Sequence, residues 1–187
     1  MMTSPRATRP EHHIETERLL LRPLRFADAA PIAEGLADLE VARWLARVPH
    51  PYRLIDAERF LTWAAGSAAR REERLFAIDG GEGLIGIVSL ISLGRAPVLG
   101  YWLAKSSWGA GLMPEAAAAV VDDAFLDPTV REIRSGVFEG NERSMRVQEK
   151  LGFVETGRSI QHNLALSADL PHIDTVLTRA RHDEFTK

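Results

Sequence analysis

The chain has no cysteine among its 187 residues. This absence excludes disulfide bonds, thiolate metal ligands and a covalent cysteine mechanism. It also suits a reducing compartment, and we expect the protein to be cytoplasmic.

Long apolar runs and excess positive charge are missing as well. No run of apolar residues has the length that spans a bilayer, so we expect no membrane partner. The formal net charge is -3, which gives no overall basic field, and we expect no nucleic-acid partner. The six histidines lack the i, i+4 pairing of a helical metal site, so we predict no metal.

The length and composition of the chain are those of one globular domain. The 187 residues, of which 45% are hydrophobic and 26% charged, are enough for a proper core. Residues 1–13 are polar and include two prolines, and we expect them to form a flexible arm. We expect residues 14–187 to form a single domain, because no linker interrupts them.

Hydrophobic periodicity predicts an α/β (α+β) domain. Extended patterns are expected at 14–22, 75–78, 84–93, 98–104, 132–138, 153–158 and 173–179. Helical patterns are expected at 26–36, 39–45, from 56 to about 70, at 113–126 and at 141–151. This order predicts a mixed, mostly antiparallel central sheet of six to seven strands, flanked by helices.

The stretch 108–116, Trp-Gly-Ala-Gly-Leu-Met-Pro-Glu-Ala, lies between a predicted strand and a predicted helix. Two glycines one residue apart allow a tight turn with no side chain in the way of a ligand. The helix that follows offers free N–H groups and the positive end of its dipole. This arrangement is typical of a phosphate site, although a G-x-G pattern alone also fits an ordinary helix start.

Two segments together resemble the GCN5-related N-acetyltransferase (GNAT) superfamily. Residues 108–116 resemble its acyl-CoA pyrophosphate loop, and residues 141–153 resemble its second signature. The pattern Asn-x-x-Ser-x-x-x-x-x-Lys-Leu-Gly-Phe in the second segment looks most like the branch that acetylates the N-termini of ribosomal proteins. The resemblance extends from Ile14 to Arg181. It departs from the family where Ser106 and Ser107 fill a place that usually holds Gln or Arg.

The resemblance implies a GNAT fold in which the fourth and fifth strands are splayed. It implies transfer of an acetyl group from acetyl-CoA, the cosubstrate, to a primary amine by direct attack in a ternary complex. Small-molecule amines and peptide N-terminal amines are both possible acceptors. By resemblance, Ser144 is the catalytic donor to the CoA thiolate, and the cofactor-binding residues are Trp102, Leu103, Ala104, Trp108, Gly109, Ala110, Gly111, Leu112, Met113 and Asn141.

Several assignments keep an alternative. A serine at position 144 also fits the first turn of a helix, and Asn141 also fits a helix N-cap. The sequence does not identify the general base, for which Glu139, Tyr101 and His162 are candidates. A non-catalytic acyl-CoA sensor or an interaction module of the same fold would carry the same cofactor site. Both a monomer and a homodimer are compatible with the sequence.

Overall fold

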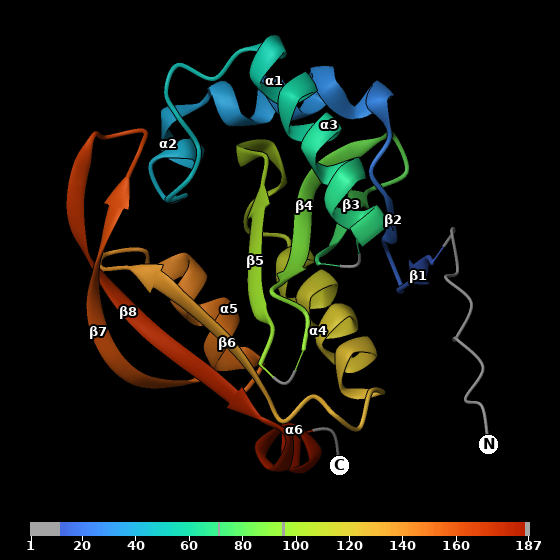
Figure 1. The fold of residues 1–187 in the computed structure, drawn as a ribbon, viewed down its shortest axis with the longest axis vertical. Coiled ribbons are helices and arrows are strands. Elements are labelled where there is room, and N and C mark those ends of the chain that lie inside the picture. The colour runs from blue at the N-terminus through green and yellow to red at the C-terminus, as the bar shows by residue number, and fades with distance from the viewer. Residues whose placement is uncertain (1–11, 71, 95, 186–187) are drawn as a thin grey trace.

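An eight-stranded mixed sheet forms the centre of the computed structural model, which describes residues 12–70, 72–94 and 96–185 (Figure 1). The strand order is β1-β2-β3-β4-β5-β6-β8-β7. Neighbouring strands are antiparallel except β5 and β6, which are parallel, so the predicted mixed and mostly antiparallel sheet is confirmed. The bounds are β1 Ile14–Glu15, β2 Leu20–Pro23, β3 Arg74–Asp79, β4 Leu84–Ile91, β5 Val98–Leu103, β6 Glu132–Phe138, β7 Val154–Asn163 and β8 Ala168–Thr178.

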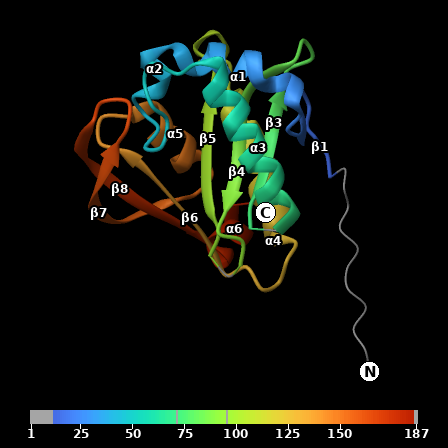
Figure 2. The ribbon, with the colours of Figure 1, turned by 45° about the horizontal axis from the view of Figure 1, so that its top comes forward.

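Helices cover both faces of this sheet (Figures 1 and 2). Among the described residues they are α1 Ala29–Ala37, α2 Leu39–Ala42, α3 Leu54–Arg70, α4 Leu112–Phe125, α5 Glu142–Lys150 and α6 Arg179–Phe185, with short 3-10 turns η1 Phe26–Asp28 and η2 Lys105–Ser107. One apolar core lies beneath α4, where Val120 and Val121 pack with sheet residues such as Val88. A second core lies beneath α1 and α3, where Ile32 packs with Ile87. The apolar stripes of these helices are therefore buried against opposite faces.

The chain differs from the sequence prediction mainly at the two ends of the sheet. The first extended pattern is divided into β1 and β2, which pair with each other through Ile14 and Leu21. This division raises the strand number to eight. At the other end, the stretch expected to be irregular forms the β7–β8 hairpin, where Ile160 pairs with Pro171. Pro171 lies beyond the last β6–β8 pair, Phe138 with His172, at a position where a sheet tolerates proline.

The parallel strands β5 and β6 touch at one end only. Val98 pairs with Arg134, and the Arg134 N–H donates to the Pro97 carbonyl at 2.9 Å. Ser135 Oγ adds a bond of 2.9 Å to the Leu99 carbonyl. Beyond these contacts the strands diverge toward their carboxyl ends, as Figure 1 shows. We call the space between them the β5–β6 gap, and it is the predicted splay.

A buried ion pair links β2, β3 and η1 near the β1 edge of the sheet. The guanidinium of Arg22 donates to both carboxylate oxygens of Asp28, at 2.9 and 2.8 Å, and to Asp79 Oδ2 at 2.9 Å. These bonds, led by the one to Asp28, raise the pKa of Arg22 above its ordinary value, although desolvation opposes them. The charge on Arg22 is therefore retained although its side chain is buried.

The structure describes only the end of the expected N-terminal arm. Residues 1–11 of the arm lie outside the described part, whereas the His12 ring nitrogen Nε2 is 2.9 Å from Asp123 Oδ1 on α4. Within the described ranges, the helices are too short or too polar to cross a bilayer.

Candidate functional site

The tip of α4 is built as a cradle for an anion. Gly109 and Gly111 have φ values of 81° and 75°, in the left-handed region that favours glycine. Gly111 is the N-cap of α4, and no side chain caps the helix there. Both glycines are exposed, and a Cβ on Gly109 would meet nothing within 4 Å. The first N–H groups of the helix therefore remain available to a ligand.

The short segment between β1 and β2 holds this loop in place. Arg18 Nη1 donates to the Ala110 carbonyl at 2.8 Å, and Arg18 Nε donates to Glu115 Oε2 at 2.7 Å. Thr16 Oγ1 donates to the other Glu115 oxygen at 2.6 Å. Burial acts to raise the pKa of Glu115, but the hydrogen bonds from Thr16 and Arg18 outweigh it and the net shift is downward. No local sequence pattern predicts this contact, because it joins segments about a hundred positions apart.

The backbone of β5 presents alternate groups to the β5–β6 gap. The Ala104 N–H donates to the Ile85 carbonyl of β4 at 2.8 Å, so this group is not available to a ligand. Backbone groups of alternate residues point to opposite edges of a strand, and those of Tyr101 and Leu103 therefore point into the gap. The Leu103 carbonyl accepts from Trp108 Nε1 at 2.9 Å. Cofactor contacts were expected through the backbone of Trp102, Leu103 and Ala104. The N–H of Leu103 is placed to make such a contact, and Tyr101, which was not expected, is placed in the same way.

Ser144 and Tyr101 meet beside the gap. Their hydroxyl oxygens are 2.9 Å apart, and Tyr101 OH also donates to the Ser144 carbonyl at 3.2 Å. Burial raises the pKa of the Tyr101 phenol, while its hydrogen bonds with Ser144 and Gln148 act to lower it. The phenol is therefore protonated at neutral pH and can donate. Asn141 Oδ1 accepts from the Ser144 N–H at 3.2 Å, which is the N-cap role expected from the sequence.

A chain of buried polar side chains joins α5 to the base of the gap. Gln148 is 1% exposed; its Nε2 donates to Ser135 Oγ at 2.8 Å, and its Oε1 accepts from Thr175 Oγ1 at 2.6 Å. Ser135 in turn donates to the Leu99 carbonyl. Three strands and one helix are thus linked where the gap begins. Sequence patterning places Gln148 on a helix but cannot show its partners.

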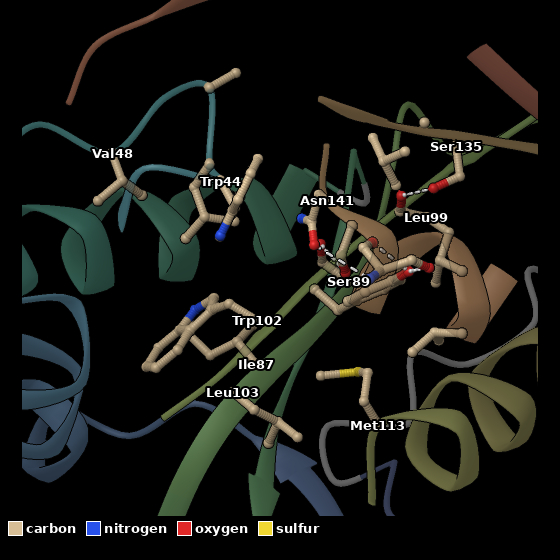
Figure 3. A pocket seen from close by; sticks show the side chains of 18 of the residues that line it. Trp44, Val48, Ile87, Ser89, Leu99, Trp102, Leu103, Met113, Ser135 and Asn141 are labelled. Carbon is tan, nitrogen blue, oxygen red and sulfur yellow. Dashed lines mark hydrogen bonds between the residues drawn. The ribbon is translucent and has the colours of Figure 1, made fainter. Parts of the chain in front are cut away.

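A cavity of about 1590 Å³ runs through the gap (Figure 3). This volume exceeds the roughly 300–1,000 Å³ of a pocket for one drug-sized ligand, so two reactants fit. Trp44, Val48 and Trp102 lie on the left of this view and Met113 on the right. Of the predicted site residues, Ala104 and Ala110 are not in its wall, whereas the others are: Trp102, Leu103, Trp108, Gly109, Gly111, Leu112, Met113, Asn141 and Ser144.

Helix α5 adds three cations to the cavity wall. They are Arg143, whose guanidinium lies 4.6 Å from the centre of the Trp108 ring, Arg146 and Lys150. Glu73 is also in the wall; burial raises the pKa of its carboxyl, and the charge of Arg47 opposes the shift. The cation of Arg143, next to the cradle, suits a phosphate.

The three candidate bases fit poorly. Glu139 is exposed and forms an ion pair with Arg158 at 2.7 Å. His162 is exposed, pairs with Asp169 at 2.7 Å and is not in the cavity wall. Tyr101 is a protonated donor. Glu139 and His162 are not in the cavity wall and Tyr101 is a donor, so none of the three presents an acceptor to an amine inside the cavity.

Comparisons with known proteins agree with this geometry. The model of the family "Acetyltransferase (GNAT) domain" matches residues 18–154. The "Probable N-acetyltransferase YjcK" of Bacillus subtilis (strain 168) is 44% identical over 78 residues, which cover 40% of this chain and 43% of that protein. The "Putative ribosomal N-acetyltransferase YdaF" of the same organism is 26% identical over 152 residues, which cover 76% of this chain and 81% of that protein.

The fold is also shared with a solved structure. Mycobacterium smegmatis RimJ in complex with CoA-disulfide has a TM-score of 0.79 and 21% identity, covering 91% of this chain and 87% of that chain. The family match includes the cradle, the gap and the second signature, which are the features that the sequence motifs predicted. The chain therefore belongs to the GNAT family and is an acetyl-CoA-dependent N-acetyltransferase.

Proposed function

We propose that the protein transfers the acetyl group of acetyl-CoA to a primary amine, with both substrates bound at once. The observation that carries the proposal is the β5–β6 gap, which opens beside the uncapped tip of α4. The diphosphate of CoA binds the N–H groups of 109–113, and the pantetheine arm enters the gap. It pairs there with the backbone groups of Tyr101 and Leu103, as an added strand would.

The chemistry follows from what lies on each side of the gap. The amine nitrogen attacks the thioester carbonyl carbon, the new C–N bond forms, and the C–S bond breaks. A backbone N–H of β5, on Tyr101 or Leu103, stabilises the negative charge that develops on the carbonyl oxygen. The hydrogen-bonded hydroxyls of Tyr101 and Ser144 supply the proton that the departing thiolate takes up.

The proposed acceptor is the N-terminal amine of a protein. This choice is supported by the second signature and by the name of YdaF, which describes a ribosomal N-acetyltransferase. The cavity side formed by Trp44, Val48, Tyr52 and Trp102 is open enough for a chain end, and its apolar rings suit a peptide side chain. A small-molecule amine is the other candidate. The single domain at 14–187, the cytoplasmic location and the monomer or homodimer stay predictions.

Release of the CoA thiol is the direct test. A thiol-reactive chromophore detects free CoA without background from the protein, because the chain has no cysteine. Isothermal titration with acetyl-CoA is measured first, and we expect saturable binding. Thiol release is then compared with peptides that carry a free α-amine, a linear polyamine and amino acids. Absence of acetyl-CoA binding at high micromolar concentration would remove the proposal.

The alternative of a non-catalytic acyl-CoA sensor is separated by the same two measurements. A sensor would bind acetyl-CoA in the titration but release no thiol with any amine. The hydroxyl pair of Tyr101 and Ser144 favours the enzyme, because a binding module has no need of a proton donor beside the gap.

A further inference from the structure

His172 and Asp174 form a hydrogen-bonded pair on β8. The distance from His172 Nδ1 to Asp174 Oδ1 is 2.9 Å, and the His172 side chain is 11% exposed. Side chains alternate along a strand, and Thr175 points to α5 through its bond with Gln148. The side chains of His172 and Asp174 therefore project from the opposite face of the sheet, and both are in the wall of the cavity.

The ring lies at the point where the gap opens. A Cβ on Gly136 would fall 2.2 Å from His172 Cε1 and 3.0 Å from Nε2, so the edge of the ring rests on the β6 backbone because position 136 has no side chain. Gly136 lies two residues after Arg134, the residue at which the pairing of β5 and β6 ends. Phe138 holds the ring from the side, with ring centres 5.5 Å apart and planes at 84°.

The contacts of the ring define its protonation pattern. A carboxylate can only accept, so the neutral imidazole donates its Nδ1 proton to Asp174 at 2.9 Å, a much shorter contact than the 3.5 Å between Nδ1 and Gln161 Nε2. Nε2 then carries a lone pair, and no described residue donates a hydrogen bond to it. A carboxylate behind one nitrogen orients the ring and stabilises the imidazolium that forms when the other nitrogen takes a proton.

We propose that His172 is the general base of the transfer reaction and that Asp174 is its positioning residue, an inference that rests on the proposed function. Nε2 takes a proton from the attacking nitrogen, whose lone pair forms the C–N bond. As the C–S bond breaks, the thiolate takes a proton from the Tyr101–Ser144 side. One proton leaves the amine and one reaches sulfur, so the products are the amide and CoA thiol.

The arrangement places the base and the acid on opposite faces of the sheet. Ser144 belongs to α5, which packs on one face, while His172 projects from the other. An amine that enters from the side of Trp44 and Trp102 therefore meets Nε2 before it reaches the thioester in the gap. The leaving sulfur stays on the side of the hydroxyl pair.

The charged group that meets the imidazole is Asp174. The flanking strands present groups that do not titrate, namely the backbone of Gly136 and the side chain of Phe138 from β6, and the side chains of Ser159 and Gln161 from β7. Further charges on these strands are already paired, Glu139 with Arg158 at 2.7 Å and Arg134 with Glu132 at 2.8 Å. A change in the pH profile after substitution of His172 is therefore attributable to the His172–Asp174 pair.

The test compares His172→Gln with His162→Gln. The control is matched, because His162 also pairs with an aspartate on the same hairpin but is exposed and outside the cavity wall. With a peptide α-amine or a polyamine, whichever turns over, we expect His172→Gln to lower kcat by about 10²-fold or more. We also expect it to remove the acid limb of the pH profile, while acetyl-CoA affinity by titration stays within about threefold.

Asp174→Asn separates positioning from direct catalysis. It removes the carboxylate that orients the imidazole, so we expect a smaller loss of kcat than that of His172→Gln, with KM for acetyl-CoA unchanged. His172→Asn replaces His172→Gln if the latter unfolds at a lower urea concentration than the parent protein.

The outcomes are distinguishable. Absence of acetyl-CoA binding or of turnover in the unmodified protein would overturn the proposed function itself. Turnover in the unmodified protein, together with a His172→Gln variant that keeps its rate within about threefold and keeps the acid limb, would overturn this inference alone. A loss in His162→Gln equal to that in His172→Gln would do the same.

Discussion

The polar chain at the base of the gap makes a quantitative prediction about stability. Thr175 and Gln148 are 3% and 1% exposed and share a hydrogen bond of 2.6 Å. Thr175→Val leaves Gln148 Oε1 buried without its donor, and Gln148→Met leaves the Thr175 hydroxyl without its acceptor. An orphaned buried polar group costs about 1–3 kcal/mol, so we expect each variant to lose about 2 kcal/mol of unfolding free energy.

The double variant is the informative one. Together, Thr175→Val and Gln148→Met remove both halves of the bond, and replacing both partners by apolar groups of similar shape is nearly neutral for that bond. Ser135 loses one incoming hydrogen bond but still donates to the Leu99 carbonyl. Because the Gln148–Ser135 bond is still lost in the double variant, we expect it to lose about 2 kcal/mol rather than the sum of about 4, which is a coupling energy of about 2 kcal/mol.

Urea unfolding of the four proteins measures this coupling, provided that their m-values agree. The control is the pair Glu142 and Arg146 on the same helix, which is exposed and separated by 3.4 Å. We expect its coupling to be at most about 0.5 kcal/mol. Additive losses for Thr175 and Gln148, within about 0.5 kcal/mol, would refute the reasoning that the buried bond is specific to this pair.

Further predictions concern the hydroxyl pair, the cradle and the buried ion pair. Tyr101→Phe removes a proton donor, and we expect kcat to fall by about 10²-fold, the lower end for acid catalysis, with acetyl-CoA affinity unchanged by titration. Gly109→Ala places a Cβ at a φ of 81°, which costs about 1–2 kcal/mol of unfolding free energy, and weaker acetyl-CoA binding should accompany it. Asp28→Asn leaves Arg22 buried with one carboxylate fewer, and urea unfolding should show a loss of about 3 kcal/mol. Burial acts to raise the pKa of Asp79, but hydrogen bonds, first from Arg22, outweigh it and lower the pKa below 3.8. The carboxylate therefore contributes its full share of stability above pH 3.8, and this share is lost as the pH falls through the lowered pKa. Acid titrations of stability should show this loss in the parent protein and not in Asp79→Asn.

The motifs of the cofactor site could be predicted from the sequence because they depend on local backbone requirements. A cradle made of backbone N–H groups needs glycines with positive φ before a helix, and this requirement leaves a local pattern at Gly109 and Gly111. The N-cap role of Asn141 is local in the same way. Element order, together with the family resemblance, was enough to predict the mixed sheet with its parted strands.

The His–Asp pair escaped prediction because its signal is weak. His172 and Asp174 are two residues apart, which places them on one face of a strand, but the extended pattern was expected to begin at Ile173. Pro171 argued against a strand there. The hairpin extends through this position because β8 is paired with β7 up to Ala168, a long-range contact that no local pattern reports.

The sequence by itself determined the family, the class of fold and the tip of α4, because these depend on residue types at short spacings. Only the tertiary structure decided which backbone groups of β5 face the gap, that Tyr101 meets Ser144, and that an imidazole lies over Gly136. Each of these depends on how distant segments pack and on the register between strands. Periodicity within one segment carries no information about either.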